Sequence, residues 1–315
     1  MRDIWQNKTY NTFLAIMVIV LMGMLIIYPQ TTFEGATQGM ESWLKIVFPS
    51  LLPFFIGAEI MISIGVVDFM SVLLSPIMKP LFGCSGSSSF VWAMSATSGY
   101  PTSARLISSL MKQNKVDKIE AQKILSFAST SGPLFMLGAV GIGMLNSPKA
   151  GRIIAISHYV SAFIIGLFFK YYGGYSKCYK NIQPKNTHIL QKALDNMSRA
   201  RQNDNRGFGQ ILGDSIKSSF ETLTMVGGFL ILFSALIHLL LSSKIMGLFP
   251  NESLIAGIVS GMLEMTTGSL IISQSSASIS AKIAGICFVI GWSGLSVHCQ
   301  VISLLSKTNI SIGLY

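Results

Sequence analysis

Apolar runs of membrane-spanning length dominate this chain, and several are interrupted in the middle by residues that break helices. Residues 88–111 hold Gly99 and Pro101 inside an otherwise apolar run. Proline has no N–H to donate, and it pushes the preceding residue, here Tyr100, out of the helical region. Lipid cannot satisfy the freed backbone groups, so such a break must be buried in protein or line a water-filled cavity. Residues 94–105 are therefore the first candidate for a solute site.

The composition predicts an all-α polytopic membrane protein. Of 315 residues, 50% are hydrophobic and 11% are charged, whereas soluble proteins carry about 25% charged residues. The net charge of +10 comes from basic residues gathered in loops, where they suit topology control and anionic lipid headgroups. No nucleic-acid-reading module is visible, and the four cysteines lack metal-ligand spacing. We therefore expect no nucleic-acid partner, no metal and no cofactor.

The order of the apolar runs predicts four regions. Residues 1–34 hold an N-terminal anchor helix over 11–28, because this run is longer than a signal-peptide core and lacks a small-residue cleavage site. Residues 35–169 are expected to form a first repeat, residues 170–206 a basic cytoplasmic loop, and residues 207–315 a second repeat.

Each repeat is expected to contain an amphipathic stretch, a whole span and two broken segments. In the first repeat the breaks fall at Gly99 and at residues 129–133, separated by a charged connector over 112–123. In the second repeat they fall at residues 264–268 and 291–294. The amphipathic stretch before them, residues 207–222, is followed by a span over 223–241 in the same order as in the first half, which indicates an internal repeat.

The two repeats have inverted topology if the segments 88–111 and 254–273 are re-entrant hairpins. With the N-terminus and the basic loop in the cytoplasm, most Lys and Arg residues fall on the cytoplasmic side, in agreement with the positive-inside rule. The first hairpin then enters from the cytoplasm and the second from outside. Paired broken helices in inverted halves are typical of a transporter with a midplane site. The alternative is that Gly and Pro here only permit close helix packing.

Polar and ionisable residues at the breaks are the candidate substrate-binding residues. They are Thr97, Ser98, Gly99, Tyr100, Arg105, Ser131, Gly132, Glu264, Thr266, Thr267, Ser293 and His298. Broken helices supply N-terminal N–H groups with partial positive charge. Arg105 suits a bidentate bond to a carboxylate, or else it anchors the hairpin end in the cytoplasm. Tyr100 or Trp292 either stacks on a ring-shaped solute or packs in the core.

Two of these candidates, Glu264 and His298, are ionisable residues inside apolar segments, where burial is costly and a functional role is the default. They are either proton-coupling groups or a structural hydrogen-bonded pair. Glu264 is also a candidate to neutralise Arg105 when the site is empty. Glu59 is expected to hold helices together, and His158 to hydrogen-bond a neighbouring helix.

An enzyme is not expected, and we assign no catalytic residue. Residues 291–294 match the Gly-x-Ser-Gly of rhomboid-type intramembrane proteases. A nucleophilic serine needs a base within hydrogen-bond reach. His298 stands five residues after Ser293, which places it on another face of a continuous helix.

Four motifs carry a family resemblance that covers residues 40–306. They are Ser98-Gly-Tyr-Pro101, Ser131-Gly-Pro-Leu-Phe135, Glu264-Met-Thr-Thr-Gly268 and Gly294-Leu-Ser-Val-His-Cys-Gln-Val301. Together they resemble the YlbJ (SpoVV) family of sporulation integral membrane proteins, whose nucleoside-recognition or Gate domain is similar in layout to concentrative nucleoside transporters. The resemblance implies a cell-membrane transporter that moves dipicolinic acid out of the mother-cell cytoplasm across the outer forespore membrane.

The implied partners are a small-molecule anion (dipicolinate), the lipid bilayer and a coupling ion, either proton or sodium; a homo-oligomer stays open. Thr102 and Ser103 stand where the family commonly has a small Gly-containing pair, which leaves the substrate open. Two alternatives remain: transport of a nucleoside-like or other small solute, and a non-transporting scaffold of a spore-envelope membrane complex. Related sequences continue beyond Tyr315, so the second repeat is expected to be short at its C-terminal end.

Overall fold

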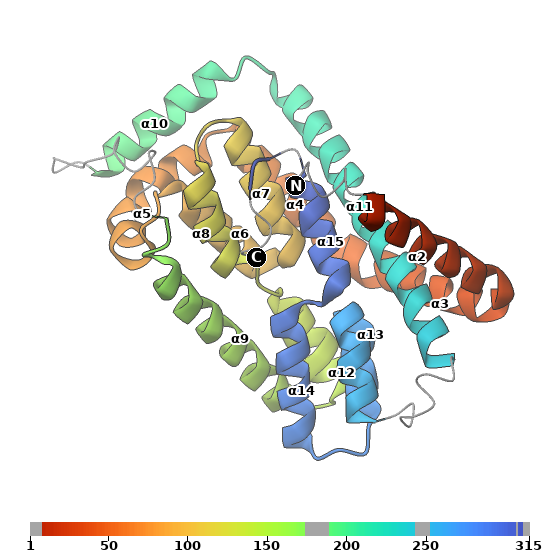
Figure 1. Ribbon diagram of the computed structural model, residues 1–315. Coiled ribbons are helices and arrows are strands. Elements are labelled where there is room, and N and C mark those ends of the chain that lie inside the picture. Colours follow the sequence, from red (N-terminus) through yellow and green to blue (C-terminus); the bar gives the residue numbers. More distant parts are fainter. Residues whose placement is uncertain (1–7, 174–188, 243–252, 307, 311–315) are drawn as a thin grey trace.

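The described part of the chain is built from helices alone. The computed structural model describes residues 8–173, 189–242, 253–306 and 308–310, and these ranges contain no strand. The α-helices are α2 (Lys8–Ile27), α3 (Pro29–Ser42), α4 (Phe48–Ser63), α5 (Val66–Phe82), α6 (Ser87–Ser98), α7 (Tyr100–Lys112), α8 (Lys118–Ala128), α9 (Pro148–Phe169), α10 (Ile189–Asn203), α11 (Phe208–Ser242), α12 (Leu254–Leu263), α13 (Met265–Gln274), α14 (Ile279–Trp292) and α15 (Gly294–Leu305), and two π-helical segments are η1 (Trp43–Val47) and η2 (Leu134–Met144). Figure 1 shows their arrangement.

Several of these helices have the length and composition of membrane spans. They are α9, α11 and the run Ile279–Leu305, which joins α14 and α15. The pairs α2–α3 and α4–α5 also qualify when each is taken as one span, with bends of 100° and 83°. Large apolar side chains such as Ile19, Ile156 and Phe168 lie exposed along them, and this surface suits lipid. The chain is an integral membrane protein with several apolar helices.

The long helix α11 runs along one side of the molecule (Figure 1). Its 35 residues form one continuous helix, about 52 Å long at 1.5 Å per residue. The predicted amphipathic stretch 207–222 and the predicted span 223–241 therefore lie on one helix from Phe208 on. α3 packs along α11 through Gly35 and Gly39, where an added Cβ atom would lie 2.8 Å from the α11 backbone. Glycine thus allows these two helices to approach closely.

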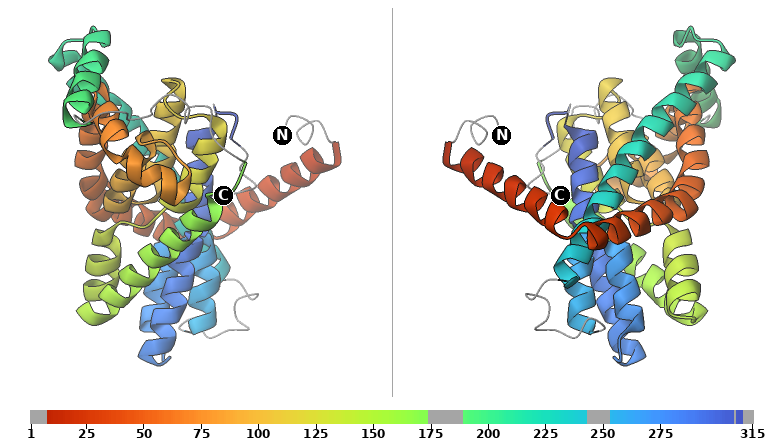
Figure 2. Two further views of the ribbon diagram at one scale, coloured as in Figure 1. Left: turned by 90° about the vertical axis from the view of Figure 1, so that its left-hand side faces the viewer. Right: turned by 90° about the vertical axis from the view of Figure 1, so that its right-hand side faces the viewer.

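The region predicted as a basic loop, residues 170–206, contains the helix α10; residues 174–188 fall outside the described residues. α10 buries Ala193 and packs against α5. Figure 2 shows α10 at one end of the molecule and the turn between α13 and α14 at the opposite end. The loop prediction weighed the charge of this region and overlooked its apolar residues at helical spacing.

The predicted charged connector is also partly helical. α8 begins at Lys118, and the Asp117 side chain caps it by accepting a hydrogen bond from the Glu120 N–H. Glu120 and Lys123 are buried. The Glu120 carboxylate accepts hydrogen bonds from the Ser85 N–H and the Ser88 hydroxyl at the start of α6. This charged residue therefore fixes the turn that leads into the first broken segment.

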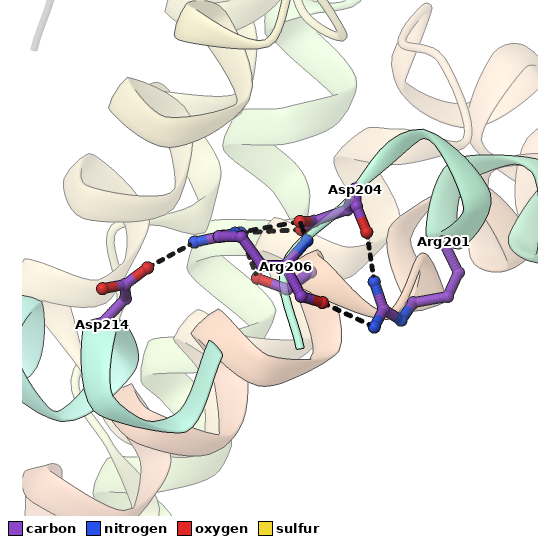
Figure 3. Close-up of polar contacts among 5 residues, drawn as sticks. Arg201, Asp204, Arg206 and Asp214 are labelled. Atoms are coloured by element: carbon purple, nitrogen blue, oxygen red, sulfur yellow. Dashed lines mark hydrogen bonds and ion pairs between the residues drawn. The ribbon is translucent and has the colours of Figure 1, made fainter. Parts of the chain in front are cut away.

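A polar cluster at the α10–α11 corner, which we call the clasp, consists of Arg201, Asp204, Arg206, Asp214 and Ser63 (Figure 3). The Arg206 guanidinium contacts the Asp204 carboxylate at 2.7 Å, Asp214 at 3.0 Å and the Ser63 hydroxyl at 3.2 Å. Arg201 donates to the backbone oxygens of Asp204 and Arg206. Hydrogen bonds from Arg206 lower the pKa of Asp204 to about 2. The clasp ties the corner to the end of α4.

The clasp should make stability depend on pH through Asp204. Its folded-state pKa of about 2 lies below the unfolded value of about 3.9, so its contribution is complete above the unfolded value and is lost as pH falls through about 2. We expect Asp204→Asn to speed hydrogen exchange of residues 201–210 at pH 6, with the difference from wild type shrinking below pH 4. Asp195→Asn is the control, because Asp195 is an exposed residue on α10. A difference that stays constant from pH 6 to pH 2 would contradict this role.

Candidate functional site

All four predicted interruptions are present. Gly99 separates α6 from α7 with φ at 103°, a conformation that favours glycine. Residues 129–133 separate α8 from η2, Glu264 separates α12 from α13, and Ser293 separates α14 from α15. The helix-breaking motifs therefore locate the breaks correctly.

The two breaks of each half lie against each other. A Cβ atom added at Gly99 would lie 3.3 Å from the Gly132 nitrogen, so the first and second breaks are in contact. A Cβ atom added at Gly294 would lie 3.1 Å from the Met265 nitrogen and 3.2 Å from the Glu264 Cα atom. The same pairing thus occurs in both halves of the chain.

Tyr100 connects the breaks of the first half to the last break. Its hydroxyl donates to the backbone oxygen of Ile290, one turn before Ser293. Its ring stands edge-on to the His158 ring, with 6.1 Å between centroids. Met265, at the third break, contacts the apolar cores on both sides of this junction. Interrupted segments from the two halves therefore meet in one region of the molecule.

A cavity of about 320 Å³ opens at this junction. Its lining comes from α8 and the second break, from α9, and from the fourth break with the flanking helices α14 and α15. The lining residues are Ser126, Ser129, His158, Ser161, Ala162, Ile165, Phe169, Gly291, Trp292, Ser293 and His298. Four hydroxyls, two imidazoles and an indole line it, and no charged side chain is among these described residues.

Hydrogen bonds fix the polar wall of the cavity. His158 Nε2 accepts from the Ser131 N–H at 2.9 Å, so we assign the proton of the neutral ring to Nδ1, which is a donor. The Ser129 hydroxyl lies 2.9 Å from the Ser103 hydroxyl on α7. The rings of Trp292 and His298 stand edge-to-face with centroids 4.8 Å apart. These side chains offer hydrogen-bond donors beside an aromatic surface.

Of the twelve predicted site residues, Ser293 and His298 line the cavity. Tyr100 and Ser131 contact His158 directly, and Gly132 touches Gly99 behind them. The hydroxyls of Thr97 and Ser98 bond carbonyl oxygens of their own helix. The prediction therefore locates the breaks, and only part of its residue set reaches the cavity.

Sequence reasoning missed most of the α9 wall. Its contribution is His158, Ser161, Ala162, Ile165 and Phe169. These positions follow the i, i+3, i+4, i+7, i+11 spacing of one helix face. His158 was expected to hydrogen-bond a neighbouring helix; its partner is instead the Ser131 N–H in the non-helical second break, and His158 also faces the cavity. The helical spacing of these α9 residues was visible in the sequence. It does not show which other helices this face of α9 contacts.

Glu264 acts as the cap of α13. Its buried carboxylate accepts from the Thr266 N–H at 2.9 Å and the Thr267 N–H at 2.8 Å. A carboxylate at a helix N-terminus satisfies donors that the helix leaves open. These N–H groups, predicted to face an anionic solute, are thus already occupied by an anion.

Arg105 lies on the face of α7 opposite the cavity. Its Nη2 atom is 3.2 Å from the Glu59 carboxylate and donates to the hydroxyls of Ser218 and Ser219 on α11. Its Cζ atom stands 4.6 Å from the centre of the Phe55 ring. The proposed pairing with Glu264 is therefore wrong, because Arg105 pairs with Glu59. The sequence could not show which face of α7 meets α4.

Within the described residues no group of three or more His, Cys, Asp or Glu side chains is placed to hold a metal. The first half matches the family model described as Gate, nucleoside recognition, over residues 44–167. The sporulation integral membrane protein YlbJ of Bacillus subtilis (strain 168) is 36% identical to this chain over 319 residues, covering 96% of this chain and 78% of that protein. This chain belongs to the YlbJ family.

The region that the Gate model matches contains both breaks of the first half and His158. Most of one cavity wall, from Ser126 to Ile165, therefore lies inside the matched region, and the fourth break lies outside it. No solved structure matches this chain.

Proposed function

We propose that this YlbJ-family protein is a transporter that moves a small anionic solute, most simply dipicolinate, out of the mother-cell cytoplasm across the outer forespore membrane. The observation that carries the proposal is the cavity at the meeting point of broken segments from both halves. Irregular backbone inside a membrane protein is tolerated where it is buried in protein or lines such a cavity. The proposal includes two halves of inverted topology, each with a re-entrant hairpin. Broken helices in corresponding positions of two halves favour this architecture.

The chemistry of the cavity suits a small planar anion. A volume of about 320 Å³ is at the small end of ligand pockets, which span about 300–1,000 Å³. The His158 Nδ1–H can donate to a carboxylate oxygen, and the described lining holds no carboxylate to repel the solute. The hydroxyls of Ser126, Ser161 and Ser293 donate to the backbone oxygens of Lys123, Ser157 and Trp292, so they must rotate to donate to the solute. The Trp292 indole N–H is occupied by the Met262 carbonyl oxygen, which leaves the ring for stacking on a pyridine.

The test is uptake of labelled dipicolinate by proteoliposomes that contain the full chain. We expect saturable uptake above that of empty liposomes, and excess unlabelled dipicolinate should block it. Labelled uridine in the same vesicles tests the second candidate, which the nucleoside-recognition description favours. Uridine uptake without dipicolinate uptake would show that the solute is a nucleoside and not dipicolinate. Uptake of neither solute by folded protein would contradict transport and favour the scaffold.

A further inference from the structure

No charge in the described cavity wall balances that of a bound anion. The described lining contains no Asp, Glu, Lys or Arg side chain. His158 Nε2 accepts from the Ser131 N–H, so this ring is neutral. Taking an anion out of water without a compensating charge is costly. A dianion would therefore need a positive group just outside the lining.

The positive groups around the cavity are engaged elsewhere. On α7, Arg105 pairs with Glu59 and faces away from the cavity. On α8, Lys123 donates to the Lys170 backbone oxygen. The α13 N-terminus, which would suit an anion, is capped by the Glu264 carboxylate. The other described Lys and Arg side chains of the lining helices are exposed outside the lining or, in the last case, bonded to the Ser273 backbone oxygen: Lys118, Lys149, Arg152 and Lys282.

All four hydroxyls of the lining have their protons engaged. Three of them donate to nearby backbone carbonyl oxygens at 2.6–2.7 Å: Ser126, Ser161 and Ser293. The Ser129 hydroxyl bonds that of Ser103, whose own proton goes to the Tyr100 backbone oxygen, so Ser129 is the donor in this pair. A hydroxyl that donates its proton elsewhere offers the cavity oxygen lone pairs. The serines of the lining are therefore acceptors for a solute.

The Nδ1–H of His158 is the side-chain donor that the described lining keeps for a solute. The Trp292 N–H donates to the Met262 backbone oxygen, and the His298 ring is hydrogen-bonded to the Trp292 backbone. The wall thus pairs several hydroxyl acceptors with one donor and no charge. A bare carboxylate can only accept, so it would need these hydroxyls to rotate. An uncharged solute that itself carries donors matches the wall as it stands.

We propose that this cavity takes the dicarboxylate as its uncharged acid, with a proton on each carboxyl group. The dianion takes up two protons from water on the side that it leaves and releases them to water on the other side, so atoms and charge balance. In the cavity the acid O–H groups donate to serine oxygens, and His158 Nδ1–H donates to a carboxyl C=O. The identity of the solute rests on the function proposed above, whereas the preference for an uncharged donor rests on the lining alone.

A binding experiment tests this preference without transport. The probe is pyridine-2,6-dicarboxamide, which has nearly the shape of dipicolinic acid, no charge, and N–H donors in place of the acidic protons. Its affinity and that of dipicolinate are measured by calorimetry on the full chain in lipid nanodiscs at pH 8 and pH 5. At pH 8 we expect the diamide to bind at least about tenfold more tightly than dipicolinate, because it brings no charge. Dipicolinate should gain at least about tenfold from pH 8 to pH 5, as more of it carries protons.

The diamide should bind equally at the two pH values. A change in its affinity would place the protons on His158 or His298 and overturn the proposal. Tighter binding of dipicolinate than of the diamide at pH 8 would also overturn it, and so would failure of both compounds to bind.

A pair of serine variants locates the binding. Ser161→Ala removes one acceptor from the lining and should weaken diamide binding about threefold or more. Ser157→Ala is the matched control, because Ser157 lies one turn earlier on α9, exposed outside the lining. Equal diamide affinity in the two variants would contradict the assignment of this cavity.

A transport experiment separates this inference from the proposed function. Proteoliposomes take up labelled dipicolinate under potassium diffusion potentials of either sign. An uncharged species should enter equally under both, whereas a bare dianion would follow the sign of the potential. Uptake that depends on the potential, or that needs calcium or magnesium and ignores pH, would overturn the inference and leave the transport function standing. Absence of dipicolinate uptake together with tight diamide binding would contradict the proposed solute and support the preference for an uncharged donor.

Discussion

Gly291→Leu should strongly reduce solute transport and leave the protein folded. Gly291 lines the cavity, and a Cβ atom added there meets no other atom within 4 Å. The leucine side chain can therefore occupy part of the 320 Å³ without displacing the surrounding helices. Leucine is also favoured over glycine inside a helix by roughly 0.8–1 kcal/mol. We expect dipicolinate uptake to fall about tenfold or more, which corresponds to about 1.4 kcal/mol.

Gly228→Leu is the matched control. Gly228 lies on α11, is exposed, and also has no atom within 4 Å of an added Cβ. It should give wild-type uptake and the same melting temperature as Gly291→Leu. Wild-type uptake by a folded Gly291→Leu protein would show that the solute does not pass through this cavity.

Gly268→Ala should produce a large loss of stability. An added Cβ atom at Gly268 would lie 2.1 Å from the Gly261 Cα atom and 2.7 Å from the Gly257 backbone oxygen. Both obstacles are backbone atoms of α12, so α12 and α13 must separate. Overpacking of a core typically costs about 1–3 kcal/mol, and backbone overlap places this variant at the upper end. We expect a lower melting temperature and less monodisperse protein after extraction.

The control for this loss is Gly228→Ala, which adds the same methyl group where nothing lies within 4 Å. That variant should be as stable as wild type or slightly more stable, because alanine favours the helix. Equal melting temperatures for Gly268→Ala and Gly228→Ala would show that α12 and α13 do not pack as described.

The breaks could be predicted because their cause is local. Glycine, proline and clustered hydroxyl residues disfavour a continuous helix wherever the chain places them. Gly99 and Ser293 both have positive φ angles at predicted breaks. The α10 helix was missed for the opposite reason: its polar residues resemble a solvated loop, and burial of Ala193 against α5 is a tertiary effect.

The site was harder to predict because its composition depends on which helix faces meet. Arg105 and Ser103 are two positions apart, yet they face different neighbours, α4 and the second break. Glu264 was predicted as a substrate ligand because a buried carboxylate needs a partner, and its partners are two N–H groups of its own turn. Burial shows that a charge must be compensated, but it does not identify the compensating group.

Solute protection of a thiol on α9 tests the central claim most directly. Ser161 lines the cavity, whereas Ser157, one turn earlier on α9, is exposed outside that lining. In a chain whose Cys178, Cys287 and Cys299 are replaced by alanine, the thiols introduced by Ser161→Cys and Ser157→Cys are modified with N-ethylmaleimide in proteoliposomes. We predict that saturating dipicolinate slows the reaction at position 161 and leaves position 157 unchanged. An unchanged reaction at position 161 would contradict a solute site where the broken helices meet.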